Sequence, residues 1–245
     1  MAIKIVTTKK SVNAVKALVY GDAGTGKTRL CATVPNPIIL SAEAGLLSLA
    51  QENIPVIELK TVQDVIEAFD FLTESEEGKK FETICLDSVS EIGEVFLNTL
   101  KKQHTDARQA YGQLAEDMTE LIRKFRDIKD KNVYFTAKSV KVEDENGITG
   151  YRPGLPGKTL LNNLPFFFDE VFALRIGKLE DGSEYNYLQT KVSMKYTCKD
   201  RSGTCEPIER PDLGRIFEKI KSGKIYVPKA MKQEEKKPEE KKEAK

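Results

Sequence analysis

The chain has 245 residues, of which 40% are hydrophobic and 31% charged, and it carries a formal net charge of +1. This composition is typical of a globular protein, and the near-zero charge excludes general electrostatic recruitment to nucleic acid or to an anionic membrane, so any DNA contact must be a local patch. No apolar stretch approaches the roughly 18 residues of a membrane span, and residues 1–10 lack the apolar region of a secretion signal.

The first half of the chain alternates apolar strand-like runs with helical stretches. This pattern predicts an α/β fold with a mostly parallel sheet and helices on both of its faces. The predicted strands are 15–20, 37–41, 54–59, 83–87 and 132–136, and the predicted helices are 27–34, 61–74, 90–102 and 110–129.

The character of the sequence changes after residue 137. Residues 139–158 are rich in glycine, proline and charge, which predicts a long loop or a loose hairpin. The next predicted elements are a short helix near 159–164, a strand at 170–176, a hairpin leading into a strand at 185–194, and a helix at 211–223.

The end of the chain contains almost no apolar residues. From Lys229 onward it holds seven lysines and five glutamates, a composition that cannot offset the entropy cost of ordering. We therefore expect one domain over 1–226 and a disordered charged tail over 227–245.

The stretch VYGDAGTGKTRL joins the first predicted strand to the first predicted helix and fits the pattern G-x-x-x-x-G-K-[ST]. Such a loop turns backbone N–H groups around phosphates, and glycine permits the positive backbone angles that this needs. The alternative, a glycine-rich turn with a solvated lysine, seldom has a strand before it and a helix after it. In the phosphate-binding interpretation Lys27 reaches the β- and γ-phosphates of ATP and Thr28 ligates Mg²⁺. The predicted nucleotide-binding residues are Gly21, Asp22, Ala23, Gly24, Thr25, Gly26, Lys27 and Thr28.

Two carboxylates follow two other predicted strands. Asp87 ends the apolar run FETICLD and is a candidate for holding Mg²⁺, although an aspartate at such a position also serves as a helix cap. Glu43 stands just beyond the strand 37–41, at the edge where parallel sheets gather ligand-facing residues. From its position alone, a catalytic glutamate and a solvated loop glutamate are equally good interpretations.

The stretches ILSAEAG, TICLDSVSEI and NVYFTAK follow the phosphate loop in that order. Their succession resembles the motifs of RecA-family recombinase ATPases over about residues 15–200, including small bacteriophage RecA-like ATPases described as nucleotide-binding or single-strand-annealing recombination proteins. The resemblance implies a RecA-like P-loop NTPase fold with a C-terminal hairpin, in which Glu43 activates the attacking water and Asp87 stands on the Mg²⁺ side. Lys138 occupies the place of a γ-phosphate sensor, where RecA itself has glutamine.

The same resemblance implies two DNA-contacting segments, 101–112 and 139–158. Cations in such segments neutralise phosphates and aromatic rings stack on bases, although the acidic run 143–145 would repel a DNA backbone. Without the resemblance, a solvated surface is the more common interpretation of this charge pattern. The residues predicted to contact single-stranded DNA are Arg108, Tyr111, Tyr151, Arg152 and Lys158.

Assembly into a homo-oligomer or filament is also implied. Residues 188–199 are predicted to form a strand on which Lys191, Ser193 and Lys195 share one face, a face that is normally just exposed to solvent. In RecA-like filaments, the strand at this place sends lysines into the ATP site of the neighbouring subunit. Lys195 is therefore the candidate cation delivered in trans, and Lys199 is the second candidate.

The favoured function is an ATP-hydrolysing recombination protein that acts on single-stranded DNA by annealing or strand exchange. The alternative is an ATP-binding regulatory or assembly module whose loops contact protein. A small-molecule kinase would need an arginine-rich lid, and the stretch 139–158 contains only Arg152.

The four cysteines indicate a reducing compartment. Cys31 and Cys85 lie in apolar runs and are expected in the core, which fits the cytoplasm, that of a bacterial host if the protein is phage-encoded. Cys198 and Cys205 are expected to flank a turn. A zinc site there would need two further ligands, and the single histidine, His104, is far away in sequence.

Overall fold

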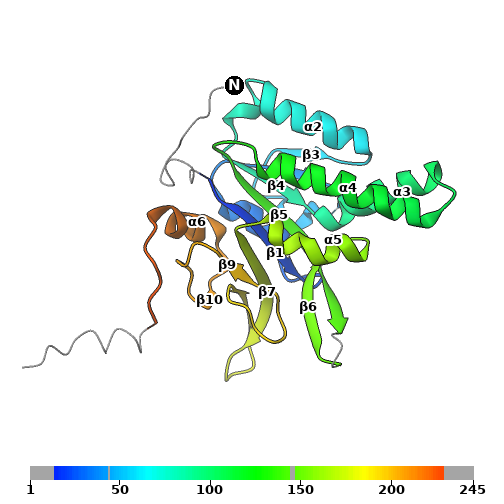
Figure 1. The fold of residues 1–245 in the computed structure, drawn as a ribbon. Helices are drawn as coiled ribbons and strands as arrows, with labels where there is room; N and C mark the ends of the chain where they lie inside the picture. Colours follow the sequence, from blue (N-terminus) through cyan, green and yellow to red (C-terminus); the bar gives the residue numbers. More distant parts are fainter. Residues whose placement is uncertain (1–13, 44, 144–146, 229–245) are drawn as a thin grey trace, which may run out of the picture.

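A mixed β-sheet forms the centre of the molecule (Figure 1). The structure is a computed structural model and describes residues 14–43, 45–143 and 147–228. The main path of the sheet runs β10-β8-β7-β1-β5-β4-β2-β3. Its strands are β1 (Lys16–Gly21), β2 (Pro37–Ser41), β3 (Val56–Glu58), β4 (Thr83–Asp87), β5 (Asn132–Glu143), β7 (Glu170–Lys178), β8 (Glu184–Gln189) and β10 (Ile208–Glu209), while β6 (Thr149–Gly154) pairs with β5 and β9 (Lys199–Asp200) with β7.

The six strands from β7 to β3 along this path are parallel to their neighbours. The carboxyl ends of β1, β2, β4 and β5 therefore meet at one edge of the sheet, which is where ligands bind in parallel α/β folds. The C-terminal strand β8 returns antiparallel to β7, as a hairpin. The predicted fold class, a mostly parallel α/β sheet with a C-terminal hairpin, is confirmed.

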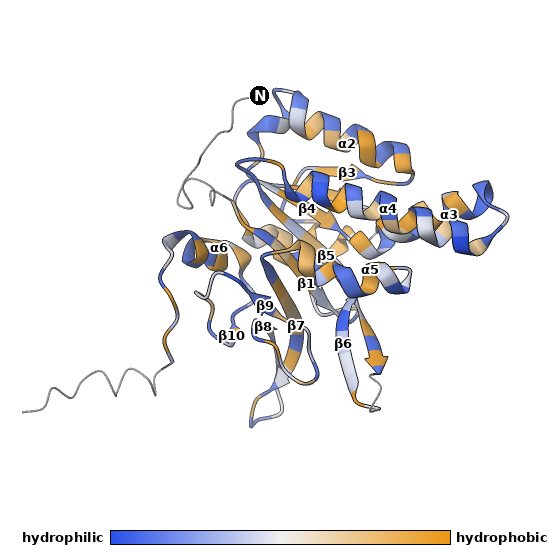
Figure 2. Cartoon of the chain, in the orientation of Figure 1, coloured by the Kyte–Doolittle hydropathy of each residue, from blue (hydrophilic) through white to orange (hydrophobic). Residues whose placement is uncertain are grey.

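Helices cover both faces of the sheet. One face packs against α2 (Val62–Glu74), α3 (Val89–Gln103), α4 (Ala107–Arg126) and α5 (Lys158–Asn163), and the other against the 3-10 helix η1 (Thr28–Thr33) and α6 (Leu213–Ser222). Side chains alternate between the two cores, so Leu18 and Tyr20 face one and Ala17 and Val19 the other. Because both faces are covered, the middle stretches of the central strands are mainly apolar, and Figure 2 shows much of this part of the sheet in orange.

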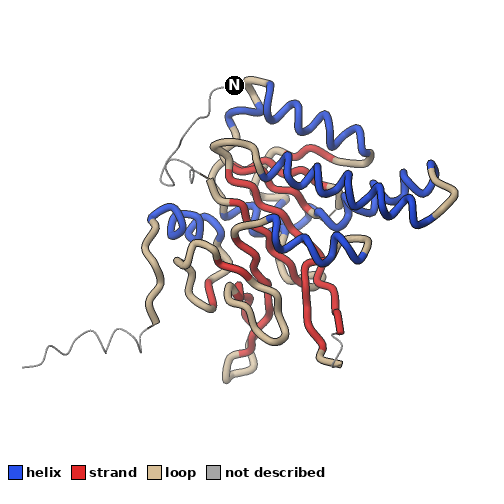
Figure 3. Tube along the Cα trace, in the orientation of Figure 1, coloured by secondary structure: helices blue, strands red, loops and turns tan. Residues whose placement is uncertain are grey.

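Two predicted segments differ from the structure, and for a third, 139–158, the structure decides between the two predicted alternatives. The predicted helix 27–34 is only the six-residue 3-10 helix η1. Residues 101–112 are the end of α3 and the start of α4 with three residues between them. In the stretch 139–158, β5 continues to Glu143 and pairs with β6, so the hairpin alternative is the right one; Figure 3 shows this pair running on beyond the helices.

The remaining short elements are η2 (Leu46–Leu49), η3 (Gly78–Lys80) and η4 (Leu164–Phe167). Within the described part of the chain, no helix has the length and apolar character needed to cross a bilayer. The charged tail predicted over 227–245 lies outside the described residues from position 229 onward.

Candidate nucleotide site and nucleic-acid groove

The phosphate loop begins at Gly21, the last residue of β1, and leads into η1. Gly24 and Gly26 adopt φ values of 78° and 92°, which favour glycine over residues with a side chain. At Gly21 a Cβ atom would lie 2.7 Å from the carbonyl oxygen of Leu174, so the close approach of β7 also requires glycine there. The motif therefore has the backbone that a phosphate loop needs.

Side chains from distant elements hold the loop in place. Asn186 on β8 donates from Nδ2 to the carbonyl oxygen of Thr25 at 2.9 Å. The buried Tyr134 on β5 donates its hydroxyl to the carbonyl oxygen of Lys27, also at 2.9 Å. Within the loop, the Thr25 hydroxyl donates to the carbonyl of Asp22. These bonds preorganise the loop before any ligand arrives, which lowers the entropy cost of binding.

The ammonium group of Lys27 folds back over the loop. Its Nζ donates to the carbonyl oxygens of Gly21 at 3.0 Å and Asp22 at 2.9 Å. Burial lowers the pKa of Lys27, and the nearby carboxylates of Glu43 and Asp87 oppose that shift. The structure thus brings Lys27 within electrostatic reach of both predicted acids.

Asp87 and Thr28 are directly bonded. The Thr28 hydroxyl donates to Asp87 Oδ2 at 2.6 Å, and the buried Thr136 on β5 donates to Asp87 Oδ1 at 2.5 Å. Thr136 was not foreseen from the sequence, because only the insertion of β5 between β1 and β4 brings it to Asp87. A hydroxyl beside a carboxylate is a hard oxygen donor set that fits Mg²⁺, with Thr28 as direct ligand and Asp87 behind it.

Glu43 is half-buried and lies beyond the end of β2. The amide of Ala42 donates to the carbonyl oxygen of Asp87 at 2.9 Å, and the Ser41 hydroxyl donates to the carbonyl oxygen of Glu43 at 2.5 Å. The Ser88 hydroxyl donates to Glu43 Oε1 at 2.5 Å. Ser88, the second residue that sequence reasoning missed, thus orients the Glu43 carboxylate. The other carboxylate oxygen, Oε2, can then accept a hydrogen bond from a water molecule.

Lys138 lies opposite Gly21 in the register between β5 and β1. Its ammonium pairs with Glu91 Oε2 at 2.7 Å, and this hydrogen bond raises the pKa of Lys138. The charge of Lys138 also contributes to lowering the pKa of Lys27, so the two ammonium groups are close enough to interact. From this position the Lys138 ammonium could leave the Glu91 carboxylate and pair with a phosphate, as a sensor residue must.

An arginine absent from the sequence predictions lies beside the phosphate loop. Arg175 on β7 lines a cavity of about 220 Å³ together with Gly21–Ala23, Thr25 and Tyr196. Its guanidinium carbon lies 4.1 Å from the centre of the Tyr196 ring, and Nη1 donates to Gln189 Oε1 at 2.7 Å. Nothing in the local sequence indicates that Arg175 lies beside the phosphate loop, because this position depends on the pairing of β7 with β1.

Three of the predicted DNA-contacting residues line one groove. Arg108 and Tyr111 from the start of α4 and Lys158 from the start of α5 surround a hollow of about 620 Å³. Tyr111 is 40% exposed, and Lys101 Nζ lies 5.8 Å from the centre of its ring. We call this hollow the α4–α5 groove. Its lining residues are Ala107, Arg108, Tyr111, Gly112, Ala115 and 156–160.

The other two predicted DNA residues lie on β6. Arg152 donates to Asn162 Oδ1 at 3.2 Å. The Tyr151 ring stacks on Tyr196 with 5.1 Å between ring centres and an interplanar angle of 17°. One face of Tyr151 is therefore already covered, and a base would have to take the other face or displace Tyr196.

The strand predicted over 188–199 is wrong in its second half. β8 ends at Gln189, and residues 190–198 form no strand, so Lys191 and Lys195 do not share a strand face. The Lys199 ammonium donates to the carbonyl oxygen of Phe168 at 2.5 Å, a structural contact within the chain. Lys195 is exposed, in a segment where Val192 and Met194 are 73% and 84% exposed.

A phosphate loop between β1 and η1, together with carboxylates at the ends of β2 and β4, defines a P-loop NTPase domain of the α/β class. The family model described as "AAA domain" matches residues 13–202, and the chain belongs to that family. AAA domains are P-loop domains that bind and hydrolyse ATP, generally with Mg²⁺.

Two further comparisons add little about function. A search of curated proteins gave no match. Among solved structures, a KaiC-like protein from the hyperthermophilic archaeon Pyrococcus horikoshii OT3 is 13% identical with a TM-score of 0.37, over 71% of this chain and 76% of that one. Similarity this low says nothing about substrate or partner.

Proposed function

We propose that this chain hydrolyses Mg·ATP and couples hydrolysis to binding of single-stranded DNA, as a recombination protein of the phage type that anneals or exchanges strands. The convergence of Lys27, Thr28, Asp87 and Glu43 at the carboxyl edge of the sheet carries the ATPase part. Lys27 neutralises the β- and γ-phosphates, Thr28 and Asp87 hold Mg²⁺, and Glu43 accepts a proton from the attacking water.

The α4–α5 groove supports the DNA part. Its lining combines two cations, Arg108 and Lys158, with the exposed ring of Tyr111, and none of the described residues that line it is acidic. A positive groove with an aromatic platform is how proteins hold single strands without sequence preference. Because the net charge of the chain is only +1, this local concentration of cations matters more than any general field.

A short chain of contacts connects the ATP site to the groove. The Ser90 hydroxyl accepts from the amide of Lys138 at 2.9 Å and donates to the carbonyl oxygen of Gly154 at 2.6 Å. Just beyond Gly154, Pro156 packs so closely on α3 that a Cβ at Gly93 would lie 2.9 Å from its Cδ atom. A shift of the Lys138 backbone on nucleotide binding would therefore pass through Ser90 to Gly154, two residues before Pro156 in the lining of the α4–α5 groove.

The experiment that tests this function is the ATPase rate of the full chain with and without single-stranded DNA. We expect Mg²⁺-dependent hydrolysis that rises when oligonucleotide is added. Hydrolysis that DNA does not change, together with no DNA binding in the presence of an ATP analogue, would favour the regulatory or assembly module that contacts protein.

Simultaneous replacement of Arg108, Arg152 and Lys158 by alanine is expected to weaken binding of single-stranded DNA at least about tenfold, on all sequences alike. Each lost phosphate contact reduces counterion release, so the slope of log affinity against log salt should become shallower by about 2. Fluorescence anisotropy of a labelled oligonucleotide between low and moderate salt measures both quantities.

A matched control replaces three exposed lysines that do not line the groove, Lys80, Lys129 and Lys221, with alanine. It changes the net charge by the same amount and should leave both the affinity and the salt slope near their wild-type values. Equal losses in the two triple variants would show that general charge, and not the α4–α5 groove together with Arg152 on β6, binds the DNA.

We also propose that the chain assembles and that Lys195 acts in the ATP site of a neighbouring subunit. The exposed Val192 and Met194 beside it offer the apolar contact area that a subunit interface needs. A lysine delivered in trans would stabilise the charge that develops on the γ-phosphate during transfer.

Mixing inactive Lys195→Ala and Glu43→Gln subunits is expected to restore part of the ATPase activity. A mixed interface can combine an intact Glu43 with an intact Lys195, whereas neither variant forms such an interface alone. The rate is measured over a series of mixing ratios, after exchange of subunits has been shown with labelled chains. No recovery at any ratio would mean that each chain hydrolyses ATP without its neighbour's Lys195.

A further inference from the structure

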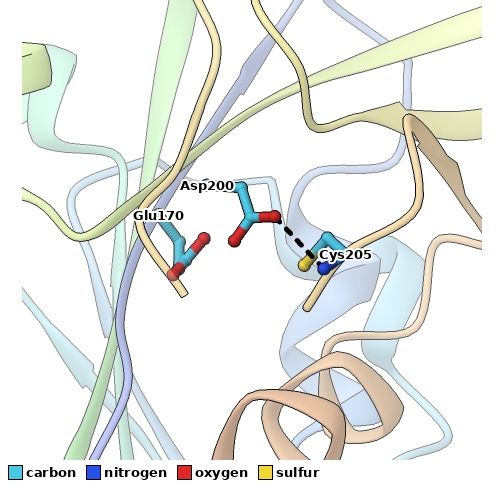
Figure 4. A group of neighbouring side chains, drawn as sticks. All are labelled: Glu170, Asp200 and Cys205. Carbon is cyan, nitrogen blue, oxygen red and sulfur yellow. Dashed lines mark hydrogen bonds between the residues drawn. The ribbon is translucent and has the colours of Figure 1, made fainter. Parts of the chain in front are cut away.

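Glu170, Asp200 and Cys205 lie together at the end of the sheet away from the phosphate loop. Glu170 opens β7 and pairs with Asp200 of β9, and it stands opposite Ala17 near the beginning of β1. One side-chain ligand atom from each of the three residues lies within 4.8 Å of those of the other two. Figure 4 shows the two carboxylates and the thiol facing one space.

Glu170 has an oxygen without a partner. The residue is 1% exposed, and one carboxylate oxygen, Oε1, accepts from the amide of Ser202 at 3.1 Å. The other, Oε2, is the single buried side-chain polar atom within residues 14–43, 45–143 and 147–228 that has no hydrogen-bond partner. A buried acceptor left in this way is costly unless something occupies its lone pairs.

The surroundings are negatively charged. The side chain of Asp200 is fully buried and accepts from the amides of Gly203 at 2.9 Å and Cys205 at 3.1 Å and from the Ser202 hydroxyl at 2.6 Å. Burial and the two carboxylates raise the pKa of the Cys205 thiol to about 12. Lys191 compensates in part, with Nζ 2.5 Å from Asp200 Oδ2, but its side chain is 39% exposed and can turn into solvent.

We propose that Glu170, Asp200 and Cys205 bind a divalent transition-metal ion, and that zinc is the best fit. One sulfur and two oxygen ligands suit zinc, with a water molecule as the fourth ligand, whereas Mg²⁺ and Ca²⁺ avoid thiolate. Tetrahedral ligation at about 2.0–2.3 Å brings ligand atoms to within about 3.5 Å of each other, so small side-chain movements close the site.

Such an ion would act on the structure and not on ATP. It would fasten β9 and the turn after it to β7. From Cys205 the chain continues through β10 to α6, where the amide of Leu213 donates to the Thr33 hydroxyl of η1 at 3.0 Å. The ion would thus support the helix that follows the phosphate loop, and the site is separate from Thr28 and Asp87.

The test is titration of the full reduced chain with Co²⁺ and Zn²⁺. We expect one Co²⁺ per chain, with the absorption band of charge transfer from thiolate to cobalt, and displacement of Co²⁺ by one equivalent of Zn²⁺. The nucleotide site has no sulfur ligand, so this band reports only on a cysteine site. Zinc should also raise the midpoint of thermal unfolding, and a chelator should reverse the increase.

Variants identify the ligands. Cys205→Ser should lose the charge-transfer band, and Glu170→Gln should weaken Co²⁺ binding at least about tenfold, since each removes one ligand. The matched control is Cys198→Ser, which changes a second buried thiol of the same segment and should bind like wild type. Lys191→Met removes the competing ammonium, keeps all three ligands and should bind Co²⁺ more tightly.

Two results would overturn the proposal. The first is folded wild-type chain that takes up no equivalent of either metal at micromolar concentrations, which would leave a proton shared between Glu170 and Asp200 as the occupant. The second is a thiolate-to-cobalt band that persists in Cys205→Ser. If Cys205→Ser or Glu170→Gln does not fold, the wild-type spectrum and the tighter binding of Lys191→Met still decide.

Discussion

Replacing Lys27 with alanine is expected to weaken Mg·ATP binding by about two orders of magnitude or more. Lys27 supplies the positive charge at the phosphate loop, and hydrogen bonds to charged groups contribute about 1.5–3 kcal/mol each. In the free protein its ammonium is held by the carbonyl oxygens of Gly21 and Asp22, so it is already positioned over the loop. Backbone N–H groups alone cannot replace a full charge beside a triphosphate.

Equilibrium binding of a fluorescent ATP analogue in the presence of Mg²⁺ measures this loss. The control is Arg29→Ala, which removes a cation two residues further along the chain. Arg29 points to the carbonyl oxygen of Ser48 and to Glu52, so its loss should leave nucleotide affinity within a few-fold of wild type. Retained affinity in Lys27→Ala, with a native circular dichroism spectrum, would contradict the assignment of the phosphate loop.

The fold could be predicted largely because hydrophobic periodicity and turn residues are local signals. A continuous apolar run such as Leu18–Tyr20 indicates a strand buried on both faces, and the phosphate loop marks where that strand ends. The predicted strand 185–194 is longer than the observed β8, which ends at Gln189, and the reason lies outside that segment. Residue Thr190 donates its amide to the carbonyl oxygen of Pro207, and the chain then leaves the edge of β7.

Those parts of the site that depend on strand order could not be predicted. Thr136 reaches Asp87 because β5 lies between β1 and β4, and Arg175 reaches the phosphate loop because β7 lies on the other side of β1. The local sequence does not indicate which strands are neighbours in the sheet. The acids at 43 and 87 were within reach of sequence reasoning, because the carboxyl ends of parallel strands always share one edge.

The neighbours of Cys205 also depend on how the strands pair. A zinc site at Cys198 and Cys205 needs two further ligands, and the single histidine, His104, is distant from both in sequence. In the structure the two thiols are not partners in one site. Glu170, 35 positions before Cys205 in the sequence, is brought to it by the pairing of β7 with β9.

Replacing Glu43 with glutamine is expected to leave Mg·ATP binding nearly intact while slowing turnover at least about tenfold. General-base catalysis typically contributes about 10²–10⁴-fold, so a larger loss also fits the proposed role. Glutamine has the same shape as glutamate, and its amide oxygen can still accept the Ser88 hydroxyl bond. The loop and the Mg²⁺-side pair of Thr28 and Asp87 are untouched, so the change removes basicity and little else.

Steady-state ATPase rates and equilibrium nucleotide binding, measured on the same samples, separate the two effects. Glu58→Gln is the matched control, because Glu58 ends the neighbouring strand β3 and its exposed carboxylate pairs only with Lys60 among the described residues. It should hydrolyse ATP at the wild-type rate. Ser88→Ala should give an intermediate rate with unchanged binding, since it releases the carboxylate that Ser88 orients without removing the base. Wild-type turnover by Glu43→Gln would remove Glu43 from catalysis and leave it as a hydrogen-bond partner of Ser88 at the edge of the site.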